Sequence, residues 1–336
     1  MAARGGGAAV GSCRRFPGRP SPPGMMMMPG RHNCARREGR LTPVVLRIAR
    51  GTRRTRRAAS SPRRTTGVGK KFDALNPSGV LGTSTRLPLL VYFHGGAFLV
   101  HSAFSGAHFR FLNALVSAAP AVAVSVEFRF RLAPKHPLPA AYDDAWAALR
   151  GPWVRAAGRA VAGRARRPRR LFVAGDSTGG NIAHNVAMRA GRSGGLPGGA
   201  RIEGMVLLHP YFRGKELVPS ERAESRSLER AERWWAFVCA GRYGIDHPFV
   251  NPLAMAAVEW AALGCRRALV TVAELDKMRD CGRRYVDALR ASAWAGDEAA
   301  LCEDQGERHV FFLRKSNGSD KAKKDMIAAV ASFMAS

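Results

Sequence analysis

The sequence predicts one α/β domain in which helices cover a mostly parallel sheet on both faces. Short apolar runs rich in β-forming residues alternate with segments of helical periodicity over some 250 residues. The runs are apolar almost throughout, which is typical of strands buried on both faces of a parallel sheet. Hydrophobic residues make up 46% of the 336-residue chain, enough for a large core, so wholesale disorder is excluded.

The expected elements follow one another in regular order from residue 87. Strands are predicted at 87–93, 121–126, 171–174, 205–208, 268–272 and 310–313. Helices are predicted between and after them, at 108–118, 140–149, 181–190, 280–291 and 322–334. These elements place the domain at residues 81–336. A charged, Trp-bearing helical segment at about 213–262 interrupts the alternation and is interpreted as a small helical cap.

The net charge of +29 suggests a nucleic-acid-binding protein, but its distribution argues against that class. Residues 1–71 hold 18 Lys and Arg with one acid, and residues 151–170 hold seven Arg with none. The remainder of the chain is only mildly basic, so no nucleic-acid partner is expected. Residues 1–80 are rich in Gly, Pro and Arg and are expected to be disordered or aberrant, and both basic segments could be frame-shifted translations.

Composition also bears on the expected location. No run approaches the roughly 20 apolar residues of a membrane span. The six cysteines show no CxxC pair and no metal-ligand spacing, so reduced thiols in a cytoplasmic protein are expected. The Arg-rich, acid-poor N-terminus resembles an organelle transit peptide and provides the alternative. No oligomeric state is indicated.

The strongest chemical signal is the GDSTGG motif at residues 175–180, which fits GxSxG. It follows an expected strand and precedes an expected helix, the context of a nucleophile elbow. Flanking glycines remove the Cβ atoms that would clash in the sharp turn. The helix N-terminus favours negative charge beside the hydroxyl. Ser177 is therefore the candidate nucleophile, and a plain Gly-rich turn is the bland alternative.

A second signal, HGGAF at residues 94–98, follows the first expected strand. Acyl transfer needs backbone N–H groups that point at the oxyanion of the tetrahedral intermediate. The Gly95-Gly96 turn lets bare backbone approach a substrate, and the Thr178 N–H can supply another donor. His94 is expected to orient this loop and not to act as a base.

An acid and a base are expected after the nucleophile, because elbow hydrolases place Ser, Asp or Glu, and His in that order. Asp276 lies just past the strand expected at 268–272, with Glu274 and Asp280 as competitors. Asp280 is better explained as an acidic residue in the first turn of the next helix, where it interacts favourably with the helix dipole. His309 is the one histidine after Asp276, which makes it the candidate general base.

These blocks together resemble the plant carboxylesterase family, relatives of hormone-sensitive lipase and of the gibberellin receptors. The resemblance runs from about residue 87 to 334 and includes LPLLVYFHGGAF (87–98), LFVAGDSTGGNIAHNVAMRAG (171–191), LVTVAELD (269–276) and HVFFL (309–313). It implies an α/β-hydrolase fold with a small helical cap and hydrolysis of small carboxylic esters. No cofactor and no metal are implied.

Carried over by position, the resemblance implies that Ser177 attacks the ester, His309 moves the proton and Asp276 orients the imidazole. Gly95, Gly96 and Ala97 would line the oxyanion hole with Thr178, although the family more often has glycine at 97 and alanine at 178. Two alternatives stay on the same fold. A receptor-like member lacks the catalytic His, and a dehydratase uses the same pocket for elimination.

Overall fold

Seven parallel strands form the centre of the molecule. The computed structural model describes residues 44–49 (backbone only), 87–119, 121–127, 133–151, 170–197, 199–222, 226–314 and 320–336. In this part of the chain the strand order is β1-β3-β2-β4-β5-β6-β7, and every neighbouring pair is parallel. The strands are β1 (Val44–Ala49), β2 (Leu89–Phe93), β3 (Val122–Glu127), β4 (Leu171–Asp176), β5 (Ile202–Leu208), β6 (Cys265–Ala273) and β7 (Glu298–Asp304).

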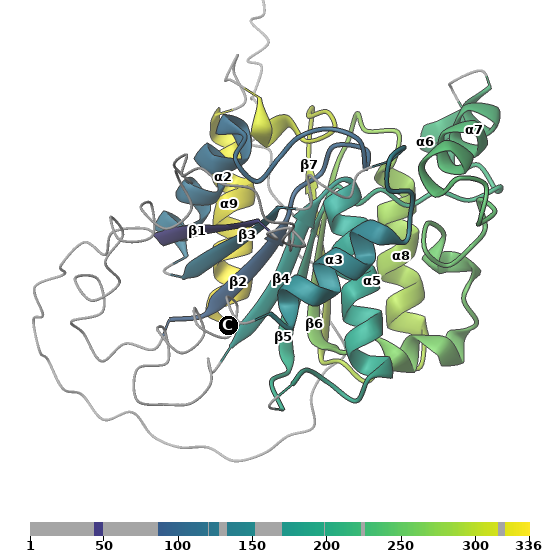
Figure 1. Cartoon of the computed structure of the whole chain (residues 1–336). Coiled ribbons are helices and arrows are strands. Elements are labelled where there is room, and N and C mark those ends of the chain that lie inside the picture. Colours follow the sequence, from purple (N-terminus) through teal and green to yellow (C-terminus); the bar gives the residue numbers. More distant parts are fainter. Residues whose placement is uncertain are drawn as a thin grey trace, which may run out of the picture.

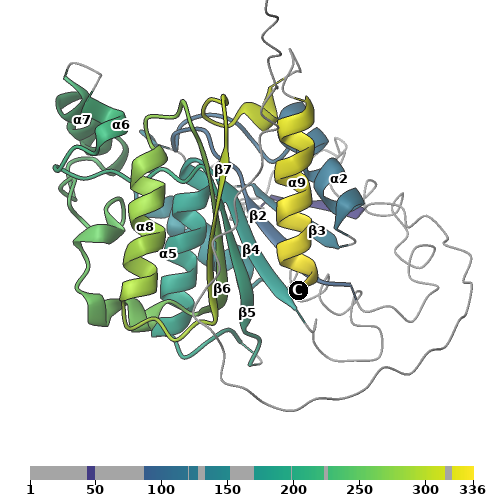
Figure 2. The same cartoon turned by 180° about the vertical axis from the view of Figure 1, so that it is seen from behind.

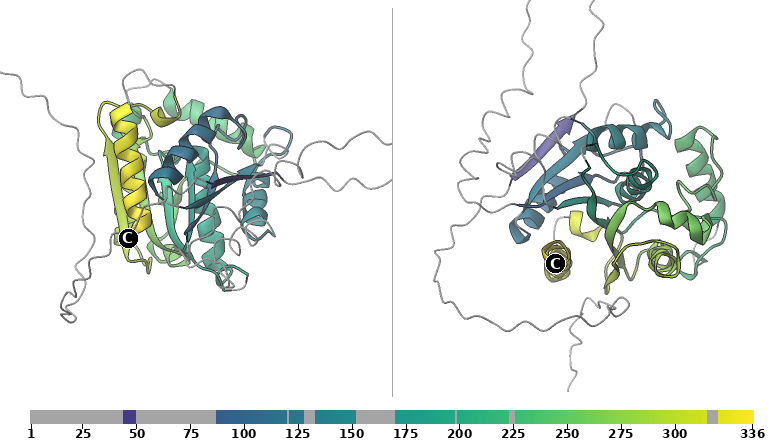
Figure 3. Two further views of the ribbon diagram at one scale, coloured as in Figure 1. Left: turned by 90° about the vertical axis from the view of Figure 1, so that its left-hand side faces the viewer. Right: turned by 90° about the horizontal axis from the view of Figure 1, so that it is seen from below.

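Helices cover both faces of this sheet, as the sequence predicts. One face packs against α3 (Ala140–Leu149), α5 (Thr178–Arg192) and α8 (Arg279–Ala291), and the other against α2 (Gly106–Ala118) and α9 (Asp320–Ala335). Figure 1 shows the first group and Figure 2 shows α2 and α9 from behind. Seen from below, the two groups lie on opposite sides of the twisted sheet (Figure 3).

Strand β2 shows how sequence pattern becomes a two-faced core. All five residues are buried, and successive side chains alternate between the two hydrophobic clusters. Leu89, Val91 and Phe93 face the α3–α5–α8 side, while Leu90 and Tyr92 face the α2–α9 side. Because successive strand side chains point to opposite faces, an unbroken apolar run is what a doubly covered strand needs.

The expected last strand, 310–313, is wrong. Residues 311–313 form the short 3-10 helix η5 (Phe311–Leu313), and the last strand is β7, which pairs with β6. Phe312 packs on Phe111 of α2 with ring centroids 4.7 Å apart, so the apolar run fills the core without joining the sheet. Strand β7 carries acids at both ends, and its edge position leaves several residues half-buried, which hides the apolar signal.

Like β7, strand β1 was not expected from the sequence. β1 lies within the segment expected to be disordered or aberrant, and it pairs in register with β3 from Val44↔Val122 to Ala49↔Glu127. The rest of the basic N-terminal segment and residues 152–169 of the second Arg-rich segment lie outside the described residues.

The cap segment at 213–262 divides into two parts. Its first part holds the short helix α6 (Pro219–Arg222) and α7 (Ser227–Cys239), which project beyond the end of α8 (Figure 1). Its last part holds the 3-10 helices η3 (Pro252–Ala254) and η4 (Ala257–Ala262). Trp260 of η4 is buried against His184 of α5, with ring centroids 6.0 Å apart, so this part belongs to the body of the domain.

The described cysteines meet the expectation of reduced thiols only in part. Cys239, Cys265 and Cys281 are free and buried. Cys302 is disulfide-bonded, contrary to the expectation. No helix in the described residues is long and apolar enough to cross a membrane.

Candidate active site

Ser177 lies in a sharp turn between β4 and α5. Its backbone has φ 52° and ψ −119°, a strained conformation for a residue with a side chain. The turn is held from β5 and the loop after it, because the Ser177 N–H donates to the Leu208 carbonyl at 2.9 Å and the Tyr211 N–H donates to the Ser177 carbonyl at 2.9 Å. The strand, turn and helix expected around GxSxG are therefore present.

The glycines of this turn are required by close backbone approach. A Cβ on Gly175 would lie less than 3.0 Å from the Gly179 carbonyl, and a Cβ on Gly179 would lie less than 3.0 Å from the backbone of Phe93 and His94. The end of β2 and the start of α5 thus touch through bare backbone. This contact brings the loop after β2 to the nucleophile.

We expect Gly179→Ala to destabilise the protein, although the same substitution inside an unconstrained helix stabilises by up to about 1 kcal/mol. The new methyl group meets backbone of β2, which cannot rotate away, so the cost should be about 1–3 kcal/mol or more. Thermal unfolding should show a Tm lower by several degrees. Gly244→Ala is the matched control, because nothing lies within 4 Å of its Cβ position. An unchanged or higher Tm for Gly179→Ala would contradict the packing argument.

Ser177, His309 and Asp276 form a continuous chain of hydrogen bonds. His309 Nε2 lies 3.0 Å from Ser177 Oγ, and His309 Nδ1 lies 2.6 Å from Asp276 Oδ2. The other carboxylate oxygen accepts the Met278 N–H at 3.0 Å. The three residues come from the turn after β4 and from the loops after β6 and β7. Parallel strands end at the same edge of the sheet, so residues 132 positions apart meet there.

Asp276 is buried and ionised by its surroundings. Burial raises the pKa of its carboxyl, but the hydrogen bond and charge of His309 and the N–H of Met278 outweigh burial, and the pKa is lowered overall. The side chain of Asp276 is 2% exposed and that of His309 is 28% exposed. A buried anion therefore faces one side of the imidazole, and the other side can reach substrate.

The rival acids have other partners. Glu274 accepts the Gly306 N–H at 2.7 Å. Asp280 binds Arg279 and Arg283 and accepts the Ser220 N–H, at the start of α8 where an acid suits the helix terminus. Among these three acids, Asp276 is the one within hydrogen-bond distance of His309.

The loop after β2 differs from expectation at Gly95. Its N–H donates to Asp176 Oδ1 at 2.9 Å and is therefore not free to serve an oxyanion. Gly96 and Ala97 follow with φ values of 124° and 55°, which turn the backbone over the elbow. Thr178 is the first residue of α5, where a helix leaves its N–H groups without intrahelical partners. His94 Nδ1 lies 2.8 Å from the Gly95 carbonyl, in agreement with an orienting role.

Asp176, the residue before the nucleophile, fixes this loop and was not singled out from the sequence. Its Oδ1 accepts the Tyr92 hydroxyl at 2.6 Å and the Gly95 N–H, and His108 Nε2 lies 3.3 Å away. Burial raises the pKa of Asp176, but the contacts from His108, Tyr92 and Gly95 lower it further, to about 2. The signal that could have identified Asp176 is its position: it is an acidic residue at the end of an apolar strand, directly before Ser177.

Comparisons with known proteins identify the family of the chain. A family model described as the α/β-hydrolase fold matches residues 90–313. A 2-hydroxyisoflavanone dehydratase from Glycyrrhiza echinata is 41% identical over 75% of this chain and 77% of its own length. A probable carboxylesterase 2 from Arabidopsis thaliana is 36% identical over 74% of this chain and 76% of its own length. The chain belongs to the plant carboxylesterase family of α/β-hydrolases.

A solved structure supports the same assignment. A fungal esterase from Rhizomucor miehei is 26% identical to this α/β-hydrolase, with a TM-score of 0.60 over 76% of this chain and 75% of the other. The fold expected from the sequence is therefore confirmed.

His209, at the end of β5, supports the loop that carries the base. Its Nδ1 accepts the Val310 N–H at 3.0 Å, and its ring lies beside His309 with centroids 5.9 Å apart. Val310 has φ 46°, an unfavourable value for a β-branched residue, so this contact helps to hold the loop. In the sequence, nothing marks His209 as functional, since it is a single histidine followed by a proline.

We expect His209→Leu to lower kcat by up to about 10²-fold with little change in KM, because a small displacement of His309 spoils proton transfer. His209→Asn keeps an acceptor near the Nδ1 position and should recover part of the rate. Steady-state kinetics of both variants, with thermal unfolding as the folding control, check this. Equal losses in the two variants would contradict a role for the Nδ1 acceptor.

Among the described residues, three side chains lie close enough together to hold a metal ion. Donor atoms of His209, Asp276 and His309 lie within 4.8 Å of one another. His209 Nδ1 is occupied by Val310, and His309 Nδ1 by Asp276. An ion at this place would have to displace those contacts, and we assign no metal role to the trio.

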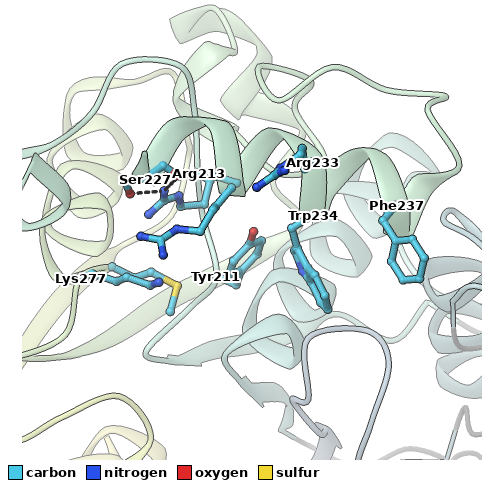
Figure 4. A pocket seen from close by; sticks show the side chains of 10 residues that line it. Tyr211, Arg213, Ser227, Arg233, Trp234, Phe237 and Lys277 are labelled. Atoms are coloured by element: carbon cyan, nitrogen blue, oxygen red, sulfur yellow. Dashed lines mark hydrogen bonds between the residues drawn. The ribbon is translucent and has the colours of Figure 1, made fainter. Parts of the chain in front are cut away.

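A cavity of about 760 Å³ opens under α7, between it and the loops after β5 and β6. Tyr211 and Met278 line it, and each is hydrogen-bonded through its N–H to a residue of the site, Ser177 and Asp276 respectively. Figure 4 shows side chains from α7 and from these loops around the same space. α7 is anchored to the loop after β2 by buried Trp235, whose ring lies 6.4 Å from that of Phe98. α7 therefore forms one wall of a cavity whose other side includes Tyr211 and Met278, the neighbours of Ser177 and Asp276.

Proposed function

We propose that the protein is a carboxylesterase that hydrolyses small carboxylic esters through an acyl-enzyme on Ser177. The observation that carries the proposal is the Ser177–His309–Asp276 hydrogen-bond chain at 3.0 and 2.6 Å. The relationship to a probable carboxylesterase at 36% identity supports the same reaction class.

The first half-reaction uses the two faces of His309. In the tautomer that donates from Nδ1 to Asp276, Nε2 accepts the Ser177 hydroxyl proton while Oγ attacks the ester carbonyl carbon. The carbonyl π electrons move to oxygen and form the tetrahedral oxyanion. When the intermediate collapses, the C–O bond breaks, His309 returns the proton to the leaving alcohol, and the acyl group stays on Oγ.

The second half-reaction repeats these steps with water. His309 takes a proton from water as the oxygen attacks the acyl carbon, then returns it to Ser177 Oγ as the acid leaves. Asp276 stays ionised and stabilises the charged imidazole in both halves.

The N–H groups of Gly96, Ala97 and Thr178 are the proposed oxyanion donors. Gly96 and Ala97 belong to the loop that Asp176 fixes, and Thr178 adds the positive end of the α5 dipole. Alanine at 97 and threonine at 178 both keep the backbone N–H, so neither removes a donor.

A dehydratase is the second candidate, because a 2-hydroxyisoflavanone dehydratase is 41% identical to this chain. In such a reaction His309 would remove a proton from carbon and return one to the departing hydroxyl, with no acyl group on Ser177. A receptor-like protein is less well supported, since His309 is present and bonded to both partners. The nucleic-acid alternative rests on the charge of residues 1–71 and 151–170, and no site residue contributes to it.

The test is turnover of p-nitrophenyl acetate and butyrate with covalent labelling by a fluorophosphonate, followed by peptide mapping of the label. The esterase proposal expects turnover and one label on the peptide that contains Ser177. The same preparation is assayed for loss of water from 2-hydroxyisoflavanone. Dehydration without ester turnover or label would replace the esterase by the dehydratase, and folded protein with neither activity would favour the receptor-like alternative.

A cytoplasmic location belongs to the same proposal. The free, buried thiols Cys239, Cys265 and Cys281 support it, whereas the disulfide at Cys302 favours an oxidising compartment. The Arg-rich, acid-poor N-terminal segment supports an organelle as the alternative.

A further inference from the structure

The cavity under α7 has an unusual chemical lining. Four of its side chains are cationic (Arg213, Arg230, Arg233 and Lys277), and no carboxylate occurs among the described residues that line it. Three aromatic rings complete much of the wall, from Tyr211, Trp234 and Phe237. Figure 4 shows the cationic and aromatic side chains surrounding one space. The triad chemistry described above does not require this charge.

The four cations have different roles. Arg213 is buried and bonded to Glu221 at 2.5 Å and to the Ser227 hydroxyl at 2.9 Å, so it fixes the start of α7. Arg230 and Arg233 are three residues apart on α7 and therefore share a face of the helix. Both are exposed, and so is Lys277. The contact of Arg233 with Glu229 is a surface pair at 3.8 Å, which does little to cancel its charge.

Lys277 lines the cavity with an exposed side chain and is next to Asp276 in the sequence. It lies between the catalytic acid candidate Asp276 and Met278, whose N–H bonds that acid. Tyr211, on the other side, bonds the carbonyl of Ser177. Tyr211 and Met278 thus line the cavity and also contact Ser177 and Asp276, so an ester at Ser177 that extends past these two residues enters the cavity.

The volume and lining indicate what such a group is. About 760 Å³ falls in the range of cavities that hold drug-sized ligands. Rings such as Trp234 and Phe237 bury a flat or apolar body, while Arg and Lys bind carboxylates through charge-assisted hydrogen bonds. A neutral acyl chain would contact the rings alone, whereas a chain that ends in a carboxylate would also pair with a cation such as Arg233.

We propose that this cavity selects esters in which one half carries a carboxylate on an aromatic or apolar body. The inference rests on the proposed esterase function and names its substrate class. Because the cations of α7 and Lys277 are exposed to solvent, the preference weakens as salt screens them.

The test compares matched esters that differ by one carboxylate. For the acyl half, mono-p-nitrophenyl glutarate is compared with p-nitrophenyl valerate. For the alcohol half, 4-butyryloxybenzoate is compared with 4-methylphenyl butyrate. In one of the two pairs we expect kcat/KM to favour the acid by about tenfold at low salt, with the ratio falling as salt is raised.

The variant Arg230→Gln/Arg233→Gln should move that acid-to-neutral ratio toward one. Arg201→Gln is the matched control, because Arg201 is exposed and precedes β5 at the opposite end of the strand from the cavity. Fluorophosphonate labelling of each variant reports whether Ser177 remains reactive in folded protein.

A ratio near one in both pairs, or a preference that survives the double substitution, would overturn the inference. Neither result touches the esterase proposal, since turnover of the neutral esters and labelling of Ser177 test that separately. Loss of turnover on all four esters in the wild-type protein would instead overturn the proposed function itself.

Discussion

Replacement of Ser177 by alanine should lower kcat for p-nitrophenyl butyrate by about 10⁶-fold and abolish fluorophosphonate labelling. The hydroxyl is the group that becomes acylated, and no other atom of the triad can take its place. The loss should appear in kcat and not as unfolding. The bonds that hold the turn run through the backbone of Ser177, to Leu208 and from Tyr211, and alanine keeps both.

The matched control for this variant is Ser117→Ala. Ser117 is exposed on α2, and its hydroxyl donates to the carbonyl of Asn113 one helical turn earlier. This variant should keep full activity and label. Residual activity of Ser177→Ala near that of the unsubstituted protein, or a label that persists on another residue, would reject Ser177 as the nucleophile.

Replacement of Asp276 by asparagine should lower kcat by about 10⁴-fold while the protein stays folded. The amide has nearly the same shape as the carboxylate, but its NH₂ group can donate to His309 Nδ1. Such a bond favours the tautomer with its proton on Nε2, which cannot accept the Ser177 proton. Loss of the buried negative charge also removes the partner of the imidazolium that forms during the reaction.

The pH profile gives this prediction a second readout. The folded-state pKa of Asp276 is lowered from 3.8, so the carboxylate is ionised throughout the range above pH 5. The stabilisation it gives is present above the unfolded pKa and is lost as pH falls through the lower folded value. Wild-type activity between pH 5 and 9 should therefore contain no step from Asp276.

Two neighbouring acids serve as controls for Asp276→Asn. Glu274→Gln removes a contact to the Gly306 N–H, and Asp280→Asn removes contacts to arginines at the start of α8. Each should change kcat by far less than Asp276→Asn. A larger loss in either control would transfer the role of the triad acid to that residue.

The site residues that could be predicted from the sequence are those marked by a local sequence pattern. The elbow is a local structure, in which a buried strand, glycines at 175 and 179 and a following helix leave few conformations for Ser177. Chain order then limits the base to His309. The acid was less certain, because Glu274, Asp276 and Asp280 lie within seven residues and the loop geometry decides which carboxylate turns inward.

The errors in the fold have the same origin. The apolar run at 310–313 looks like a buried strand, yet Phe312 is buried by contact with Phe111 of α2, far away in sequence. β7 at the sheet edge is half-buried and has a weaker apolar pattern. β1 lies inside a basic segment, and its place in the sheet comes from its pairing with β3.

The sequence by itself determined the parallel α/β architecture and the turn at Ser177, because these depend on hydrophobic periodicity and on a rigid local turn, and it predicted the acid and the base from chain order. The tertiary structure decided that Gly95 donates to Asp176, that His209 supports Val310 and that cations from α7 and the β6 loop face one cavity. Each of these contacts joins residues from separate elements. Local preference does not encode such contacts, since packing of the whole sheet brings the elements together.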